Sequence, residues 1–309
     1  MFGPILAKPN LLVRIAAMGL MGLAATGAAI AWSLPARAQQ DAAGAQPSDA
    51  AAPSAQTYTL QFKYASGQLR TYKCTVELTG SIGSGFGSQP INQRYESIFT
   101  QFVQAVRSDG AGTIQTHLVS VQLTAAGRTR TYTNAQLAAM QPPIRIMTTD
   151  GKPDGGIIVS RVGAGDPNSY LNIPRTQVLP DFPVGIGESW RSTVFAAGQL
   201  LYAKSTLEQV TQGDAGSIAR IGTKFYGTSG QAPTTRAADS ASKLYVQTTG
   251  SGVTELNTTD GSLVSVTDTL DTVEKYTPSA NATGLAAQTG PVTAHMSAHI
   301  HMEALGNAP

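Results

Sequence analysis

Three histidines close to the C-terminus form the residue pattern in this chain that is most suggestive of chemistry. They lie in an alternating run that predicts a β-strand, with His295, His299 and His301 on one side of it. Alternate residues on one face of a strand stand about 7 Å apart, so His299 and His301 could share a zinc or copper ion with a third ligand from a neighbouring strand. The competing interpretation is a polar, solvent-facing side that uses histidine in place of Thr or Gln. No second cluster of Cys, His or carboxylate at ligand spacing accompanies these residues, which favours the solvent-facing interpretation.

Other chemical motifs are weak or missing. The chain contains neither the G-x-S-x-G nucleophile turn nor the H-E-x-x-H zinc motif. The glycine-rich stretch Gly80–Gly87 lacks the Gly-Lys-Ser/Thr ending of a phosphate-binding loop, so we expect a flexible loop between strands. Asp150 and Asp154 lack calcium-loop spacing, and turn chemistry explains both. We therefore assign no catalytic, cofactor-binding or metal residue and predict a protein that is not an enzyme.

The first 38 residues predict export. Lys8 and Arg14 precede a mostly apolar, uncharged run, and Ala36 and Ala38 occupy the −3 and −1 positions of a signal cleavage site. The alternative is an uncleaved N-terminal anchor, because twenty uncharged residues are about enough to span a bilayer. In either case the remaining chain is expected in the periplasm or outside the cell, with the membrane contacted only through a retained anchor.

Composition divides the exported part. Residues 39–56 are rich in Ala, Ser, Pro and Gln and predict a disordered linker, followed by a β-rich domain over residues 57–303 and a disordered tail over 304–309. The whole chain has 21 basic and 19 acidic residues; without Lys8, Arg14 and Arg37 it has 18 basic residues against the same 19, a net charge of about −1. A domain so close to neutral argues against nucleic acid as a partner.

Period-two alternation dominates the domain. Apolar residues alternate with polar ones in Thr57–Tyr64 and again in Tyr72–Leu78, and the intervening Ala65–Gln68 predicts that these runs form a β-hairpin with one buried face. Cys74, the only cysteine, lies on the apolar side and is expected to be a buried, inert thiol. Trp190 follows a glycine turn, and a core anchor is the favoured interpretation over a sugar-stacking platform.

The remaining elements follow the same logic. Residues 134–140 predict the one short helix, with Thr133 as N-cap and Pro142 after its end. Gly227–Ser242 is expected to be a polar loop. Further strands are predicted over residues 91–106, 112–123, 144–149, 201–212, 217–226, 243–249, 252–257, 263–276 and 291–302.

Three short matches recur in the same order in both halves of the domain. They pair Gly67–Arg70 with Gly187–Arg191, Val106–Ile114 with Val210–Ile218, and the two Thr-Thr-Asp-Gly turns at 148–151 and 258–261. One interpretation is an internal duplication, with repeats over 57–165 and 184–303. The other is that hairpin turns favour Gly and Asp everywhere. The predicted fold class is mainly β: a large curved antiparallel sheet, as a half-barrel or a two-part sheet, with one short helix.

The strand–G-Q/E–strand opening at Tyr64–Tyr72 and the V-G-x-x-W-like element at Val184–Trp190 resemble those of a group of secreted bacterial β-rich domains. Here an extra residue precedes the tryptophan. The overall arrangement is similar to the LolA/LolB lipoprotein-carrier fold. The resemblance implies binding or scaffolding in the cell envelope and supplies no catalytic residues. We therefore predict an exported, non-enzymatic protein that binds an apolar ligand or an envelope protein through a curved sheet face; the alternative is a metal-binding protein or metal-dependent hydrolase that uses the three histidines.

Overall fold

Antiparallel β-sheet makes up most of the chain that the computed structural model describes, which comprises residues 56–154, 178–196, 199–213, 216–229, 243–279 and 290–306. These residues all belong to one compact unit. The strands are β1 (Thr57–Tyr58), β2 (Leu69–Ser84), β3 (Gly87–Val106), β4 (Gly112–Ala125), β5 (Arg128–Thr131), β6 (Arg145–Met147), β7 (Val184–Gly185), β8 (Ser189–Ala196), β9 (Gln199–Gly213), β10 (Gly216–Ser229), β11 (Lys243–Asn257), β12 (Ser262–Thr277) and β13 (Val292–Ala304). The one described helix is α2 (Asn134–Ala139).

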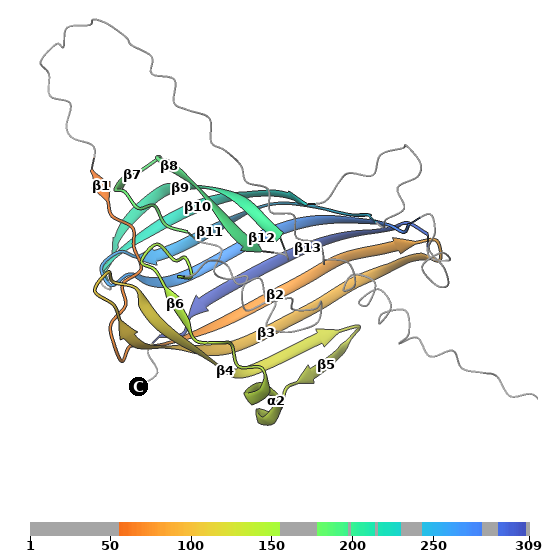
Figure 1. Cartoon of the computed structure of the whole chain (residues 1–309), viewed down its shortest axis with the longest axis horizontal. Helices are drawn as coiled ribbons and strands as arrows, with labels where there is room; N and C mark the ends of the chain where they lie inside the picture. Colours follow the sequence, from red (N-terminus) through yellow and green to blue (C-terminus); the bar gives the residue numbers. More distant parts are fainter. Residues whose placement is uncertain are drawn as a thin grey trace, which may run out of the picture. The chain divides into compact units, whose positions relative to one another are not determined.

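Eleven of these strands form a single sheet (Figure 1). Its order is β5-β4-β3-β2-β13-β12-β11-β10-β9-β8. The short strand β6 also pairs with β4, at the opposite end of β4 from β5. The C-terminal strand β13 lies between β2 and β12 and thereby joins the strands of the first half to those of the second. The sheet does not close, because β8 forms one edge and β5 and β6 form the other. The predicted large, curved antiparallel sheet with one short helix is confirmed.

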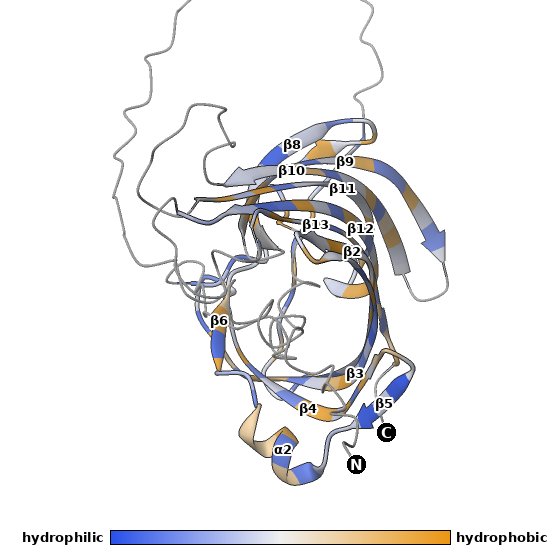
Figure 2. Cartoon of the chain, turned by 90° about the vertical axis from the view of Figure 1, so that its right-hand side faces the viewer, coloured by the Kyte–Doolittle hydropathy of each residue, from blue (hydrophilic) through white to orange (hydrophobic). Residues whose placement is uncertain are grey.

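The sheet has an apolar inner face and a polar outer face. On β13, for example, Ala294, Ile300 and Met302 are buried, whereas His295 and His299 are exposed. Figure 2 shows how the sheet bends from β8–β10 through β13 and β2 to β3 and β4. Long strands with this alternation have one face that must be covered.

Two clusters of buried side chains form the core. The larger one draws residues from eight strands of the sheet, together with Leu137 of α2 and Val178. The smaller one lies where the sheet meets the segment before β2 and the segment around β7. In it, Leu60, Leu179 and Val184 pack against inner-face residues of β8–β11, among them Trp190. The two-stranded β1–β7 sheet joins these two segments, with Tyr58 opposite Val184.

The predicted hairpin between residues 57–64 and 72–78 is wrong. Both edges of β2 are occupied, by β3 on one side and β13 on the other, so no edge is left for the earlier segment. That segment forms only the short strand β1 and then crosses the end of the sheet. The N–H of Phe62 donates to the carbonyl of Thr149 (2.7 Å), and the ammonium of Lys63 donates to the carbonyls of Thr258 and Thr259. Alternation identified the apolar residues correctly but not their strand partner.

The predicted flexible loop at Gly80–Gly87 is also wrong, because β2 and β3 continue through it and only Gly85 and Phe86 form the turn. The segments 243–249 and 252–257 are a single strand, β11, which runs through Gly250 and Gly252. The helix is as predicted: the hydroxyl of Thr133 accepts from the N–H of Gln136, whose side chain accepts from the N–H of Thr133. This reciprocal capping box fixes the start of α2.

The leader (1–38), residues 39–55 of the linker, residues 155–165 of the first repeat and most of the 227–242 loop lie outside the described residues. Residues 304–306 of the predicted tail are described, and Ala304 is the last residue of β13. Within the described ranges, no helix is both long enough and apolar enough to cross a membrane.

Candidate functional surfaces

The three C-terminal histidines lie on the outer face of β13, as predicted. Two of them contact residues of the neighbouring strand β12. The Nδ1 of His301 lies 3.0 Å from the hydroxyl of Thr267, and the Nδ1 of His299 lies 3.2 Å from the hydroxyl of Thr269. His295 lies opposite Ser81 and Val273. Two of the imidazoles therefore contact threonines on the neighbouring strand.

Around these histidines, the described part of the chain forms no metal ligand set. The carboxylate of Glu303 lies 3.8 Å from His301, and Glu77 lies opposite His299 but pairs with Arg94. Among the residues that the structure describes, no group of three His, Cys, Asp or Glu side chains is placed to hold a metal ion. The histidine side of β13 is therefore a polar outer surface, and the described residues give the metal-binding alternative no geometric support.

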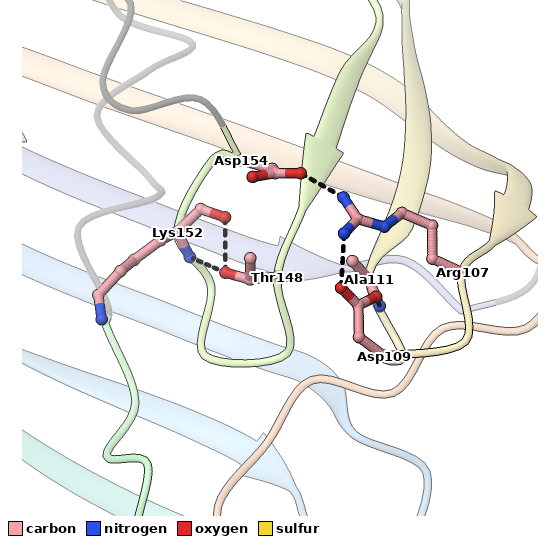
Figure 3. Close-up of polar contacts among 6 residues, drawn as sticks. All are labelled: Arg107, Asp109, Ala111, Thr148, Lys152 and Asp154. Atoms are coloured by element: carbon pink, nitrogen blue, oxygen red, sulfur yellow. Dashed lines mark hydrogen bonds and ion pairs between the residues drawn. The ribbon is translucent and has the colours of Figure 1, made fainter.

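Asp154 belongs to a network of polar contacts between turns (Figure 3), and Asp150 contacts Thr148 and Lys152 of the same network. The guanidinium of Arg107 contacts the carboxylates of both Asp109 (2.7 Å) and Asp154. Asp150 bonds with the hydroxyl of Thr148 and the ammonium of Lys152. Partial burial alone would raise the pKa of Asp150, but the hydrogen bonds and charge of Lys152 and the Thr148 hydroxyl outweigh it and hold that pKa below its ordinary value. Cations thus engage both carboxylates.

Cys74 and Trp190 are core residues, as the sequence predicted. Cys74 is completely buried, and burial raises the pKa of its thiol to about 12, so the reactive thiolate is scarce at neutral pH. The indole N–H of Trp190 donates to the carbonyl of Val178 at 2.8 Å, and its ring packs in the smaller core cluster. Neither side chain is available on the surface.

The inner face is apolar with scattered buried polar groups. Some of these pair across strands, as the hydroxyls of Thr248 and Thr272 do at 2.9 Å. The hydroxyls of Ser97 and Ser192 are buried and have no hydrogen-bond partner among the residues that the structure describes. An unsatisfied buried hydroxyl costs free energy, on the order of 1–3 kcal/mol. The inner face therefore offers hydrogen-bonding groups as well as apolar surface.

The turns that precede β2 and β8 make the same hydrogen bonds. Gly67 donates to the carbonyl of Val103 on β3 (2.9 Å), and Gly187 donates to the carbonyl of Leu207 on β9 (2.7 Å). In each case the same strand residue donates back to the residue after the glycine. Both glycines have a positive φ, +80° and +89°, which glycine adopts without strain. The first sequence match thus occupies equivalent turns.

The second sequence match, Val106–Ile114 with Val210–Ile218, occupies equivalent positions only on the first strand of each hairpin. A β-bulge skips Gln104 on β3 and Glu208 on β9, immediately after the two strand residues that anchor the turns. Beyond the bulges the hairpins differ in length, so Ile114 lies opposite Val103 whereas Ile218 lies opposite Thr211. On the second strand of each hairpin, β4 and β10, the matched residues therefore do not occupy equivalent positions.

A basic and aromatic surface, which sequence reasoning missed, lies on the outer face of β8, β9 and β10. Arg191 lies opposite Lys204, which lies opposite Lys224. In the adjacent row, Tyr202 lies opposite Tyr226. These five residues line a groove of about 340 Å³, to which the residues that alternate with them, Ser192, Ala203 and Phe225, also contribute. Single alternating cations carry little signal in a sequence, and only the strand register brings them together.

No protein-family model matches this chain, and neither does any curated protein. The chain is similar to a solved structure entitled "Lipid-protein interactions in lipovitellin", with 9% sequence identity and a TM-score of 0.44. The alignment covers 80% of this chain and 26% of that chain, so this chain spans about a quarter of the length of lipovitellin's.

Proposed function

We propose that this protein is an exported, non-enzymatic binding protein whose inner sheet face holds an apolar ligand bearing a polar group. The observation that carries the proposal is the extent of the inner face. A single core cluster runs across β2, β3, β4, β8, β9, β10, β12 and β13. Two-sheet folds cover such a face with a second sheet of similar size. Among the described residues the second sheet is the two-stranded β1–β7 pair, at the smaller cluster.

Two further features fit an amphipathic ligand. The sheet has two edges and so does not enclose its inner face as a barrel would. The buried hydroxyls of Ser97 and Ser192 could donate to a ligand's ester or carboxylate oxygen. Apolar walls with a few placed polar groups are typical of sites for small apolar molecules. Export is proposed from the leader, with delivery to the periplasm or the exterior.

The test is to recover the full chain from the exported fraction of an expressing cell and to identify what it carries. We expect a mature N-terminus at Gln39 by mass spectrometry and a co-purified lipid-like molecule by native mass spectrometry. Ala298→Trp would place a large ring on the inner face of β13 and should displace that molecule. Ser297→Trp, on the outer face beside it, changes a residue that is half-buried like Ala298 and is the matched control.

Thermal unfolding would verify that both variants fold. Equal ligand content in the two folded variants would rule out the inner face as the binding surface. Recovery of an apolar-ligand-free wild-type protein would contradict the binding function, and an N-terminus at Met1 would contradict cleavage of the leader.

A further inference from the structure

The outer face of β8–β10 concentrates positive charge in a domain that is otherwise near neutral. The side chains of Arg191, Lys204 and Lys224 are exposed and form one row across three neighbouring strands. None of them forms an ion pair with a carboxylate within the described ranges. We define these three residues, together with Leu200, Tyr202 and Tyr226, as the basic patch.

Within the described residues, no carboxylate pairs with the cations of this row. Like charges directly opposite each other on adjacent strands are destabilising. Two acidic residues, Glu208 further along β9 and Glu255 on the neighbouring strand β11, both lie against Arg220. The three cations therefore repel one another in the free protein, and a bound anion would relieve that repulsion.

Large exposed side chains accompany the cations. Tyr202 is 71% exposed, Tyr226 is 51% exposed and Leu200 is 54% exposed. Alternation places Leu200 and Tyr202 on the outer face, because Leu201 between them is completely buried in the core. A tyrosine has an apolar ring and a polar tip, and lysine has an apolar stem below its charge. This combination suits a boundary between charged headgroups and hydrocarbon.

We propose that the basic patch docks the protein on the surface of an anionic phospholipid bilayer. The row of cations contacts lipid phosphates, while Leu200 and the two tyrosines enter the boundary between headgroups and acyl chains. The row spans two strand spacings, about 10 Å, which is wider than one phosphate needs. The sequence alone predicted a membrane contact only through a retained N-terminal anchor. This contact is separate from that anchor and from the inner-face ligand.

Vesicle binding tests the proposal. The full chain is sedimented with phosphatidylcholine vesicles and with vesicles of equal parts phosphatidylcholine and phosphatidylglycerol. The patch variant carries both Lys204→Glu and Lys224→Glu. The control variant carries Lys73→Glu and Lys275→Glu, which make the same change of net charge on the outer face of β2 and β12. The variants keep the N-terminal segment of the wild type, so a difference between them reports the patch.

We expect the wild type and the control to bind the anionic vesicles, with the patch variant weakened at least tenfold, because each basic residue near such a surface strengthens binding severalfold. Binding should also weaken as salt is added. In a separate variant, Tyr202→Trp, fluorescence should shift to the blue on anionic vesicles, because the ring leaves water.

Three results would overturn the docking proposal. One is equal binding by the folded patch and control variants. Another is the absence of a fluorescence shift from Trp at position 202. The third is saturable binding of inorganic phosphate or glycerol phosphate that depends on Lys204 and Lys224 without binding to vesicles, which would identify a site for a small soluble anion instead.

Discussion

Glu274 is a carboxylic acid in an environment that opposes its charge. It lies on the inner side of β12, opposite Val246 and Ala294. Burial raises its pKa above the ordinary value of 4.5. The folded state therefore holds this proton at pH values where the unfolded chain has lost it, and stability falls as the pH rises from about the ordinary pKa through the raised one.

The variant Glu274→Gln should accordingly be more stable than the wild type at neutral pH and about equally stable below the ordinary pKa. Urea unfolding across this pH range measures the difference. Asp271→Asn, on the outer face of the same strand, is the control and should leave the pH profile as in the wild type. A Glu274→Gln variant that is less stable at neutral pH would show that the carboxylate has a stabilising partner.

At the scale of single residues, the sequence predicted burial well and interaction partners poorly. Alternation predicted a buried Cys74, and the large aromatic ring after a glycine turn predicted a buried Trp190; both residues are in the core. It could not place Arg191 beside Lys204, because the register between strands depends on turn lengths and on bulges such as that at Glu208. Contacts between strands depend on which strands pair and in which register, and the sequence of a single strand does not contain that information.

Strand β2 contains two interior glycines with different structural roles. A Cβ on Gly80 would lie 2.0 Å from the carbonyl oxygen of His295 on β13, and its φ is +149°. A Cβ on Gly83 would meet only the carbonyl oxygen of Thr293, at an ordinary 3.7 Å. Glycine at position 80 therefore permits the close approach of β13 along the seam between the two halves of the sheet.

We expect Gly80→Ala to destabilise the fold by about 2–4 kcal/mol, since the backbone of β2 or β13 must shift. Gly83→Ala should change stability by less than about 1 kcal/mol. Chemical denaturation of the two variants compares them directly. Similar losses for both would mean that β13 adjusts freely, contrary to the packing described.

The elements show why the hairpin and loop predictions failed. The short turn at Ala65–Gln68 predicts that the segments it joins pair with each other, yet its backbone hydrogen bonds to the sheet are made with Val103 on β3. The glycines between residues 80 and 87 indicated a loop, but backbone pairing continues through them to Ser84 opposite Gly87. The helix was predicted correctly because a capping box is local and needs no partner from elsewhere in the chain.

In the molecule as a whole, each half contacts the other through the segment that precedes its first long strand. Lys63 of the first half donates to the turn at Thr258 and Thr259 in the second. Leu179 of the second half donates to the carbonyl of Asp150 in the first, at 2.9 Å. The two segments also pair with each other through β1 and β7. The halves should therefore unfold together.

Leu60 tests this coupling, because it is 1% exposed and belongs to the first half but packs among second-half residues. Leu60→Ala should cost about 2–5 kcal/mol and lower a single unfolding transition. Leu69→Ala, at an exposed leucine, is the control and should have little effect. Two separate transitions in calorimetry would show that the halves are independent.

The unclosed sheet has a mechanical consequence. In a closed barrel the number of strands and their stagger fix the radius. A sheet with two edges is free of that constraint, so its curvature can adapt to the size of the molecule or segment that packs on its concave face. The sheet could therefore accommodate ligands of different width by bending, while every interstrand hydrogen bond is retained.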